Sequence, residues 1–175
     1  MLIMNKPPIN EIRKKDRTCN DAWITSFLSR ARIGNLATRW EDQPFITPLT
    51  FWYDPQAHEI YIHHTKSGGR LHANLERFPQ VCFEASEIGE LIPADTALSF
   101  SVQYRSAVVF GQVRLVEEGV EQRRILYGLI EKYFPGLQPG RDFRPITEGE
   151  LARTAVFAIT IDSWSGKSNW KTKSE

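Results

Sequence analysis

The residues best suited to chemistry lie where a β-strand pattern gives way to a turn of small residues and then to a helix. Ser67 is placed to cap that helix, while Gly68 and Gly69 allow a ligand to approach the backbone closely. A helix start offers unpaired N–H groups and a positive dipole end, and Lys66 and Arg70 add positive charge beside it. The pattern indicates a site for an anionic group such as a phosphate. The alternative is an ordinary turn followed by a solvated arginine.

Two adjacent histidines precede this turn. Because successive strand residues point to opposite faces, His63 and His64 cannot both face one pocket. A metal site would also need His58 or His72 to fold back toward them, so we expect no metal site. The one imidazole that faces the turn adds a donor to the groups around the anion.

A second stretch, residues 43–54, has the composition of a strand suited to a flat ligand. Pro48 cannot donate to a β-ladder, so its nitrogen should face an edge, a bulge or a ligand. Thr47 and Thr50 supply small hydroxyls, and Leu49 lies between them among aromatic neighbours. Such a strand could lie against a flat aromatic molecule. The alternative is a strand that merely bends at its proline.

Several function classes lack support. The chain has 175 residues and a formal net charge of +1, so no global basic field for nucleic acid exists. We find no apolar run of membrane-spanning length and no signal-peptide core, and we expect a cytoplasmic protein. Nucleophile-elbow, Walker and dinucleotide-binding motifs are absent. Cys82 lies in a strand pattern, where we expect a packed, inert thiol.

The elements that position these residues are mainly strands. A helix capped by Asn20 or Asp21 comes first, and two more are expected at Gly69–Phe78 and Val120–Phe134. The expected strands are Ile33–Thr38, Phe45–Tyr53, Glu59–His64, Gln80–Ala85, Ser99–Val116 and Ala155–Ile161. Six strands with peripheral helices predict a closed or nearly closed antiparallel barrel, because closure removes exposed edges.

The order and spacing of these segments resemble the pyridoxamine 5′-phosphate oxidase-like flavoproteins, most closely the small flavin-nucleotide-binding subgroup that includes nitroimidazole-resistance reductases. The resemblance covers roughly residues 18–167. The matching segments are Ile33–Thr38, Pro44–Phe51, Ile60–His63, Gly68–Arg70, Pro79–Phe83, Tyr104–Gly111 and Ile159–Lys167.

The resemblance implies a six-stranded split β-barrel that forms a homodimer and holds FMN between its subunits. Ser106 would then reach the cofactor from the partner subunit, and His63 would stand beside the flavin. The remaining cofactor-binding residues that it implies are Thr47, Pro48, Leu49, Thr50, His64, Lys66, Ser67, Gly68, Gly69 and Arg70.

The resemblance also implies an FMN-dependent oxidoreductase that transfers a hydride to or from a small flat substrate, with NADH or NADPH as a possible electron donor. We assign no catalytic residue firmly; His63 is the best candidate, because its charge can change near neutral pH. The alternatives are a flavin-nucleotide-binding protein without turnover, or a split barrel that carries deazaflavin or haem. An absorption spectrum separates these chromophores.

Two departures from the family pattern limit the substrate assignment. The turn has one basic residue fewer than the usual Gly-Arg-Lys, although Lys66 can substitute. The Trp-and-Arg pattern that grips pyridoxal phosphate in vitamin B6 oxidases is not evident near the C-terminus, which argues against that substrate.

From the extent of the resemblance we expect an N-terminal arm at 1–17, an FMN-binding domain at 18–167 and a tail at 168–175. The arm is expected to lie on the surface or on a partner subunit, or else to be a frayed tail.

Overall fold

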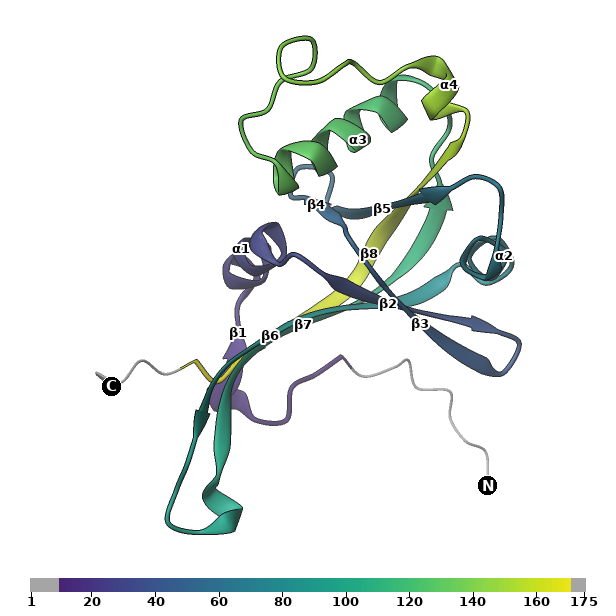
Figure 1. Ribbon diagram of the computed structural model, residues 1–175. Helices are drawn as coiled ribbons and strands as arrows, with labels where there is room; N and C mark the ends of the chain where they lie inside the picture. Colours follow the sequence, from purple (N-terminus) through teal and green to yellow (C-terminus); the bar gives the residue numbers. More distant parts are fainter. Residues whose placement is uncertain (1–9, 171–175) are drawn as a thin grey trace.

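The computed structural model describes residues 10–170 and shows a sheet with helices at its margins (Figure 1). The strands are β1 (Thr18–Cys19), β2 (Gly34–Trp40), β3 (Gln43–Leu49), β4 (Trp52–Asp54), β5 (Glu59–Thr65), β6 (Gln80–Ile92), β7 (Ser101–Leu115) and β8 (Thr154–Ser168). The α-helices are α1 (Asp21–Arg30), α2 (Arg70–Arg77), α3 (Val120–Tyr133) and α4 (Glu148–Leu151), and 3-10 turns occur at Lys15–Arg17 and Ala97–Ser99.

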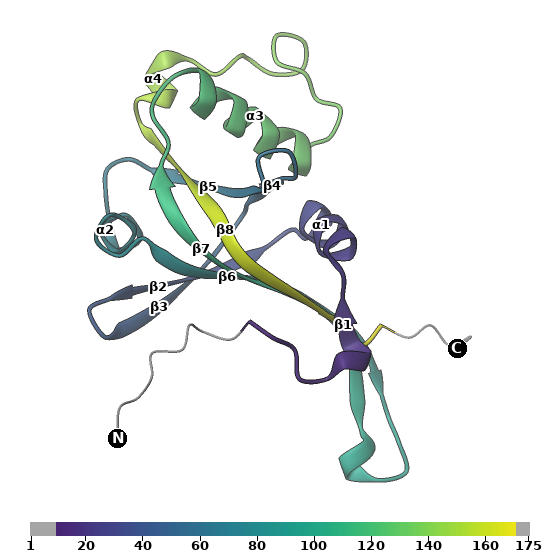
Figure 2. The same ribbon diagram turned by 180° about the vertical axis from the view of Figure 1, so that it is seen from behind.

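The strands form one antiparallel sheet in the order β3-β2-β6-β7-β8-β5-β4, with β1 added on β8. The sheet curls into a split barrel, as predicted. It has eight strands rather than six, partly because β1 adds a two-residue pairing and partly because the expected strand Phe45–Tyr53 is divided into β3 and β4. The long β6–β7 hairpin extends away from the barrel, as both views show (Figures 1 and 2).

The barrel is filled by a single large apolar cluster. Helix α1 contributes Phe27 and Leu28, which pack with Phe51, Phe83 and Phe157 of the sheet. The helix begins where the sequence predicted, because the Asn20 side chain accepts a hydrogen bond from the Trp23 N–H at 2.9 Å. The core therefore fixes the sheet against which the other helices pack.

Helix α3 covers a second, smaller cluster on the outer side of the sheet. Its Ile125 and Leu129 pack on Tyr61, Val156 and Ala158 of β5 and β8. An ion pair of 2.7 Å between Arg124 and Asp54 ties the helix to β4. Figure 2 shows α3 lying across β4 and β5. The helix is thus held above the strand that carries His63.

Several strands run further than the sequence indicated. β6 continues to Ile92 instead of ending at Ala85, and β8 continues to Ser168 instead of ending at Ile161. The sequence did not predict these extensions because their apolar periodicity fades. Ladder pairing with β7 stabilises them. Within residues 10–170 no helix is long and apolar enough to span a bilayer.

The described end of the N-terminal arm lies on its own chain. The Asn10 side chain donates to the carbonyl oxygen of Val108 at 3.1 Å and accepts from the Ser165 hydroxyl at 2.7 Å. Arg17 donates to the hydroxyl of Tyr104 at 3.0 Å. The arm residues 1–9 and the tail residues 171–175 lie outside the described residues.

Candidate functional site

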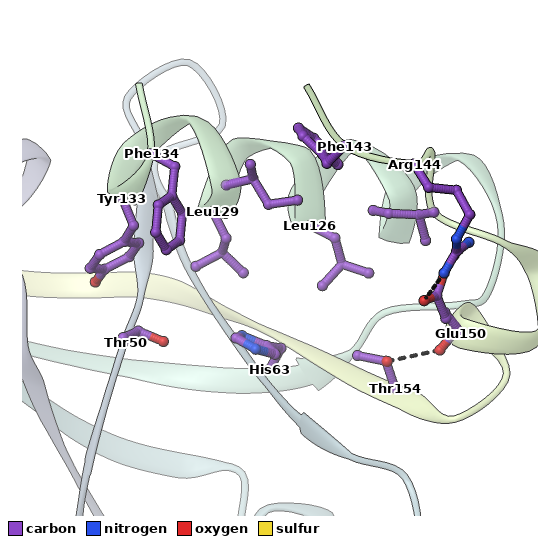
Figure 3. A pocket seen from close by; sticks show the side chains of 12 residues that line it. Thr50, His63, Leu126, Leu129, Tyr133, Phe134, Phe143, Arg144, Glu150 and Thr154 are labelled. Atoms are coloured by element: carbon purple, nitrogen blue, oxygen red, sulfur yellow. Dashed lines mark hydrogen bonds and ion pairs between the residues drawn. The ribbon is translucent and has the colours of Figure 1, made fainter. Parts of the chain in front are cut away.

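A pocket of about 580 Å³ lies between the outer side of the sheet and α3. Thr50 and His63 stand on its strand side and face Leu126 and Leu129 of the helix (Figure 3). The aromatic side chains that line the pocket are those of Tyr133, Phe134 and Phe143. The pocket therefore offers apolar walls with one imidazole, which suits a flat, largely apolar molecule.

The imidazole of His63 is tuned toward its neutral form. Although the side chain is exposed at the pocket opening, desolvation by its surroundings lowers its pKa, and the neighbouring His64 adds a smaller effect in the same direction. At neutral pH His63 is therefore uncharged, with one ring nitrogen able to donate and the other able to accept.

His64 points to the opposite face of β5, as the strand period predicted. Its ring stacks on Phe157 with centroids 5.3 Å apart, and its Nδ1 lies 2.8 Å from the carbonyl oxygen of Thr65. It does not line the pocket. The structure thus separates His63 from His64, and among residues 10–170 no group of three or more His, Cys, Asp and Glu side chains is placed to hold a metal ion.

A charged pair closes the other end of the pocket. Arg144 contacts Glu150 at 2.7 Å (Figure 3). The backbone N–H and the hydroxyl of Thr147 also donate to the Glu150 carboxylate. The hydrogen bond from Arg144, followed by those from Thr147, lowers the pKa of Glu150 to about 2. Because the two charges offset each other, this end of the pocket is polar without a strong net charge.

A second pocket of about 640 Å³ adjoins the first and shares Glu150 and Thr154 with it. Lys66 and Ser67, the first residues of the predicted turn, line it together with Arg153. Lys66 forms an ion pair with Glu118. Because the two pockets adjoin, they form one surface near the end of β5. It includes Thr50 and His63 from the first pocket and Lys66 and Ser67 from the second.

The glycine turn leads directly from this surface into α2. Gly68 and Gly69 have φ of 90° and 116°, a region that favours glycine, and a Cβ at either position would meet open space. Gly69 is the N-cap and makes no side-chain cap, so the prediction that Ser67 caps the helix is wrong. The Arg70 guanidinium stacks over Phe45 at 4.8 Å from the ring centroid. An uncapped helix start with an adjacent arginine fits an anionic phosphate.

The predicted β3 residues occupy two faces of an edge strand. Pro48 is exposed on this edge strand, which agrees with its lack of a backbone N–H donor. It lies opposite Asn35 of β2. Thr47 and Leu49 are half-buried on the other face, and neither lines either of these two pockets. Only Thr50, which follows the end of β3, reaches the pocket beside His63.

Ser106 lies far from these residues within one chain. It pairs with Lys167 on β8, whereas Thr154, at the opposite end of β8, lines both pockets. The separation is roughly 40 Å along the strand at ~3.3 Å per residue.

Cys82, which the sequence predicted to be a packed thiol, is a half-buried free cysteine. Its pKa is raised by burial and by the nearby charge of Glu84.

The helical pattern of residues 120–134 did not indicate that α3 forms a wall of the site. Ile125 and Leu129 of this helix pack in the smaller core cluster. Leu126 and Ile130, one position further round the helix, line the pocket. The signal was an apolar stripe wider than one core contact requires.

Together, the curled antiparallel sheet, the outer pocket and the glycine turn define a split-barrel protein with a site at the end of β5. The model of the pyridoxamine 5′-phosphate oxidase family matches residues 20–168, and the chain belongs to that family. No curated protein matches the sequence.

Solved structures agree on the fold. The flavocytochrome Anf3 from Azotobacter vinelandii has a TM-score of 0.81 at 23% identity, covering 92% of this chain and 73% of its own. The FAD and heme binding protein from Mycobacterium smegmatis has 0.74 at 23%, covering 90% and 76%. A putative 5-nitroimidazole antibiotic resistance protein from Bacteroides thetaiotaomicron has 0.72 at 22%, covering 86% of each chain.

Proposed function

We propose that this protein binds FMN along the surface that joins the glycine turn to the His63 pocket and acts as an FMN-dependent oxidoreductase. The observation that carries the proposal is that the apolar pocket adjoins a second pocket lined by Lys66 and Ser67, from which the chain runs through two glycines into the uncapped start of α2 at Arg70. A flavin nucleotide has the same two parts, a flat ring system and a phosphate. Family membership and the similar structures described as flavocytochrome and FAD-binding support it.

In this proposal the phosphate binds at the start of α2. The backbone N–H groups of the first turn and the Arg70 side chain supply its donors. Lys66 adds a cation beside the turn, although its ion pair with Glu118 offsets part of that charge. When bound, the flavin supplies hydride transfer at its reactive ring nitrogen.

The pocket side of the site is proposed to hold the flat ring of the flavin and, beside it, the small flat substrate. Leu126, Leu129 and Ile130 exclude water from one side, and Thr50 and His63 supply hydrogen-bonding groups on the other. Because His63 is neutral near pH 7, it can accept a proton or donate its N–H to a polar atom of the substrate. NADH or NADPH is the proposed electron donor.

The site is proposed to be completed by a second copy of the chain. Ser106 is too far along β7 to reach the turn of its own subunit, so a role at the cofactor requires a homodimer. Sedimentation of the protein should give the mass of two chains. Ser106→Ala should weaken FMN binding in that dimer, and an equal loss in a monomeric form would contradict the shared site.

The test of function is spectroscopic. The purified full chain is titrated with FMN, and the complex is then mixed with NADH or NADPH without oxygen. Saturable binding and bleaching of the flavin absorbance support the oxidoreductase. Bound flavin that neither nicotinamide reduces supports the binding protein without turnover, and a chain that binds no flavin overturns the proposal.

Haem is a second candidate, because the imidazole of His63 faces an apolar pocket and a single imidazole is sufficient to hold haem iron. Two of the similar structures are described as a flavocytochrome and a heme-binding protein. An intense haem absorption band in the native protein that is lost in His63→Gln would favour this candidate. The spectrum of the native protein also distinguishes a bound deazaflavin.

A further inference from the structure

Helix α2, whose first turn is the proposed phosphate site, lies at the margin of the sheet (Figure 1). Its second turn is held firmly, because the buried Asn74 side chain donates to the Thr38 hydroxyl of β2 at 3.0 Å and the buried Leu75 packs in the large core cluster. Gly68 and Gly69, which lead into the helix, have open space at their Cβ positions. The position of the first turn therefore depends on its own side chains.

The His72 side chain joins this first turn to β5 and β8. The centroid of its ring lies 5.2 Å from that of His64 on β5, with the ring planes at 88°, and 5.4 Å from that of Phe157 on β8. His64 in turn stacks on Phe157. The three rings thus contact one another, and the His72 side chain is only 15% exposed.

Hydrogen bonds do not account for the contact between the two imidazoles. Carbonyl and carboxylate oxygens accept, so His64 donates through Nδ1 to the Thr65 carbonyl at 2.8 Å, and His72 donates through Nε2 to Glu76 at 3.1 Å. Within residues 10–170, the other nitrogen of each ring is buried and has no hydrogen-bond partner. The rings are therefore held together by packing.

This contact links the two parts of the proposed cofactor site. His63, which precedes His64 on β5, lines the apolar pocket, whereas His72 lies in the turn proposed to bind phosphate (Figure 3). The first helical hydrogen bond joins the Ala73 N–H to the Gly69 carbonyl oxygen at 3.1 Å, so the three amides before it have no helical acceptor. A shift of the first turn would change the separation between these amides and the pocket.

We propose that His72 is a positioning residue for the phosphate of the flavin nucleotide. Its ring, packed on His64 and Phe157, holds the first turn of α2 at a fixed distance from the His63 pocket. The inference rests on the proposed function, and His72 acts through the backbone of its own turn. Because packing of the ring is what matters, phenylalanine should substitute for it, and this change also removes the unpartnered Nδ1.

Calorimetric titration of the full chain with FMN and with riboflavin tests the proposal, because riboflavin lacks the phosphate. His72→Ala should weaken FMN binding by about tenfold and leave riboflavin binding unchanged, since only the phosphate contacts are misplaced. His72→Phe should bind FMN within about twofold of the parent chain. His58→Ala, which removes an exposed histidine packed on Trp164 before the other end of β5, is the control and should change neither affinity.

Hydrogen exchange measures the position of the turn without any ligand. The Ala73 amide should exchange about tenfold faster in His72→Ala than in the parent chain or in His72→Phe, because the first turn opens more often. The Arg123 amide, which makes the corresponding first bond of α3 to Gly119, is the internal control and should be unchanged. Thermal unfolding monitors the fold. If His72→Ala does not fold, His64→Leu, which removes the partner ring, should cause the same selective loss of FMN affinity.

The positioning role is overturned if His72→Ala binds FMN like the parent chain, or if it loses riboflavin affinity equally. It is also overturned if His72→Phe loses as much FMN affinity as His72→Ala, or if Ala73 exchange is unchanged. A parent chain that binds no FMN contradicts the proposed function instead. Ala73 exchange then decides whether His72 holds the first turn in place.

Discussion

The hydroxyl of Tyr133 holds the backbone of Phe51 at the bend between β3 and β4. It accepts the Phe51 N–H at 3.0 Å and lies 3.2 Å from the Phe51 carbonyl oxygen and 2.7 Å from that of Arg32. One residue earlier, Thr50 turns into the pocket that Tyr133 also lines. A side chain of α3 thus substitutes for a ladder partner and sets the position of a site residue.

Removing this hydroxyl should destabilise the protein. Tyr133→Phe is expected to lower the free energy of unfolding by about 1–3 kcal/mol, because the half-buried donor and acceptors of the bend lose their partner. Urea denaturation measures the change. Tyr127→Phe, which removes a single bond to the Ile146 N–H in the loop before α4, is the control and should cost less. Equal costs for the two variants would contradict the role of Tyr133.

Lys132 makes stability depend on pH. Burial lowers the pKa of its ammonium to about 7 from an ordinary value of 10.5, while the group donates to the Leu28 carbonyl oxygen at 3.1 Å. Between these two values the unfolded chain binds a proton that the folded chain does not, so this group makes the free energy of unfolding rise with pH across that range. Below pH 7 both states are charged and the penalty for burying the charge is complete.

The variant Lys132→Met removes that penalty. Relative to the parent chain, it should be stabilised at pH 6, and the difference should shrink by pH 9. Urea denaturation of both proteins at the two pH values tests this. The contact of the ammonium with the Phe51 ring, 3.4 Å from its centroid, favours the charged form and reduces the effect. A stability difference that is the same at both pH values would show that Lys132 titrates normally.

Gly69 is expected to tolerate no side chain. Its φ of 116° and ψ of 173° belong to a region that is essentially restricted to glycine. Gly69→Ala should lower the free energy of unfolding by about 1–3 kcal/mol and weaken FMN binding, because relief of the strain moves the first N–H groups of α2. Calorimetric titration with FMN and urea denaturation are the measurements.

A second glycine provides the control for this variant. Gly149 lies in α4, has ordinary φ and also has open space at its Cβ position. Gly149→Ala should leave FMN binding unchanged and should not destabilise the chain, since alanine favours a helix. If both variants bind FMN like the parent, the backbone of the turn takes no part in binding.

The sequence predicted those parts of the fold that depend on local pattern. The α1 cap at Asn20, the opposite orientation of His63 and His64, and the edge position of Pro48 all follow from short-range geometry. The family and the split barrel also followed from the order of motifs. Local periodicity and backbone chemistry were sufficient for these features.

Features that depend on distant contacts were not predictable in this way. The break between β3 and β4 depends on Tyr133, which lies 82 residues after Phe51. The prediction that Ser67 caps α2 failed because the two positive-φ glycines carry the chain past it before the helix begins. The apolar wall of the pocket required the placement of α3 over β5, which tertiary packing decides.

The central claim is that the turn before α2 binds the phosphate of FMN, and calorimetric titration of Arg70→Ala with FMN and with riboflavin tests it most directly. Arg39→Ala, which removes another exposed arginine stacked on an aromatic ring, is the control. We expect Arg70→Ala to lose about 1.5–3 kcal/mol of FMN affinity and to bind riboflavin like the parent chain. Unchanged FMN affinity, or an equal loss for riboflavin, would contradict the assignment.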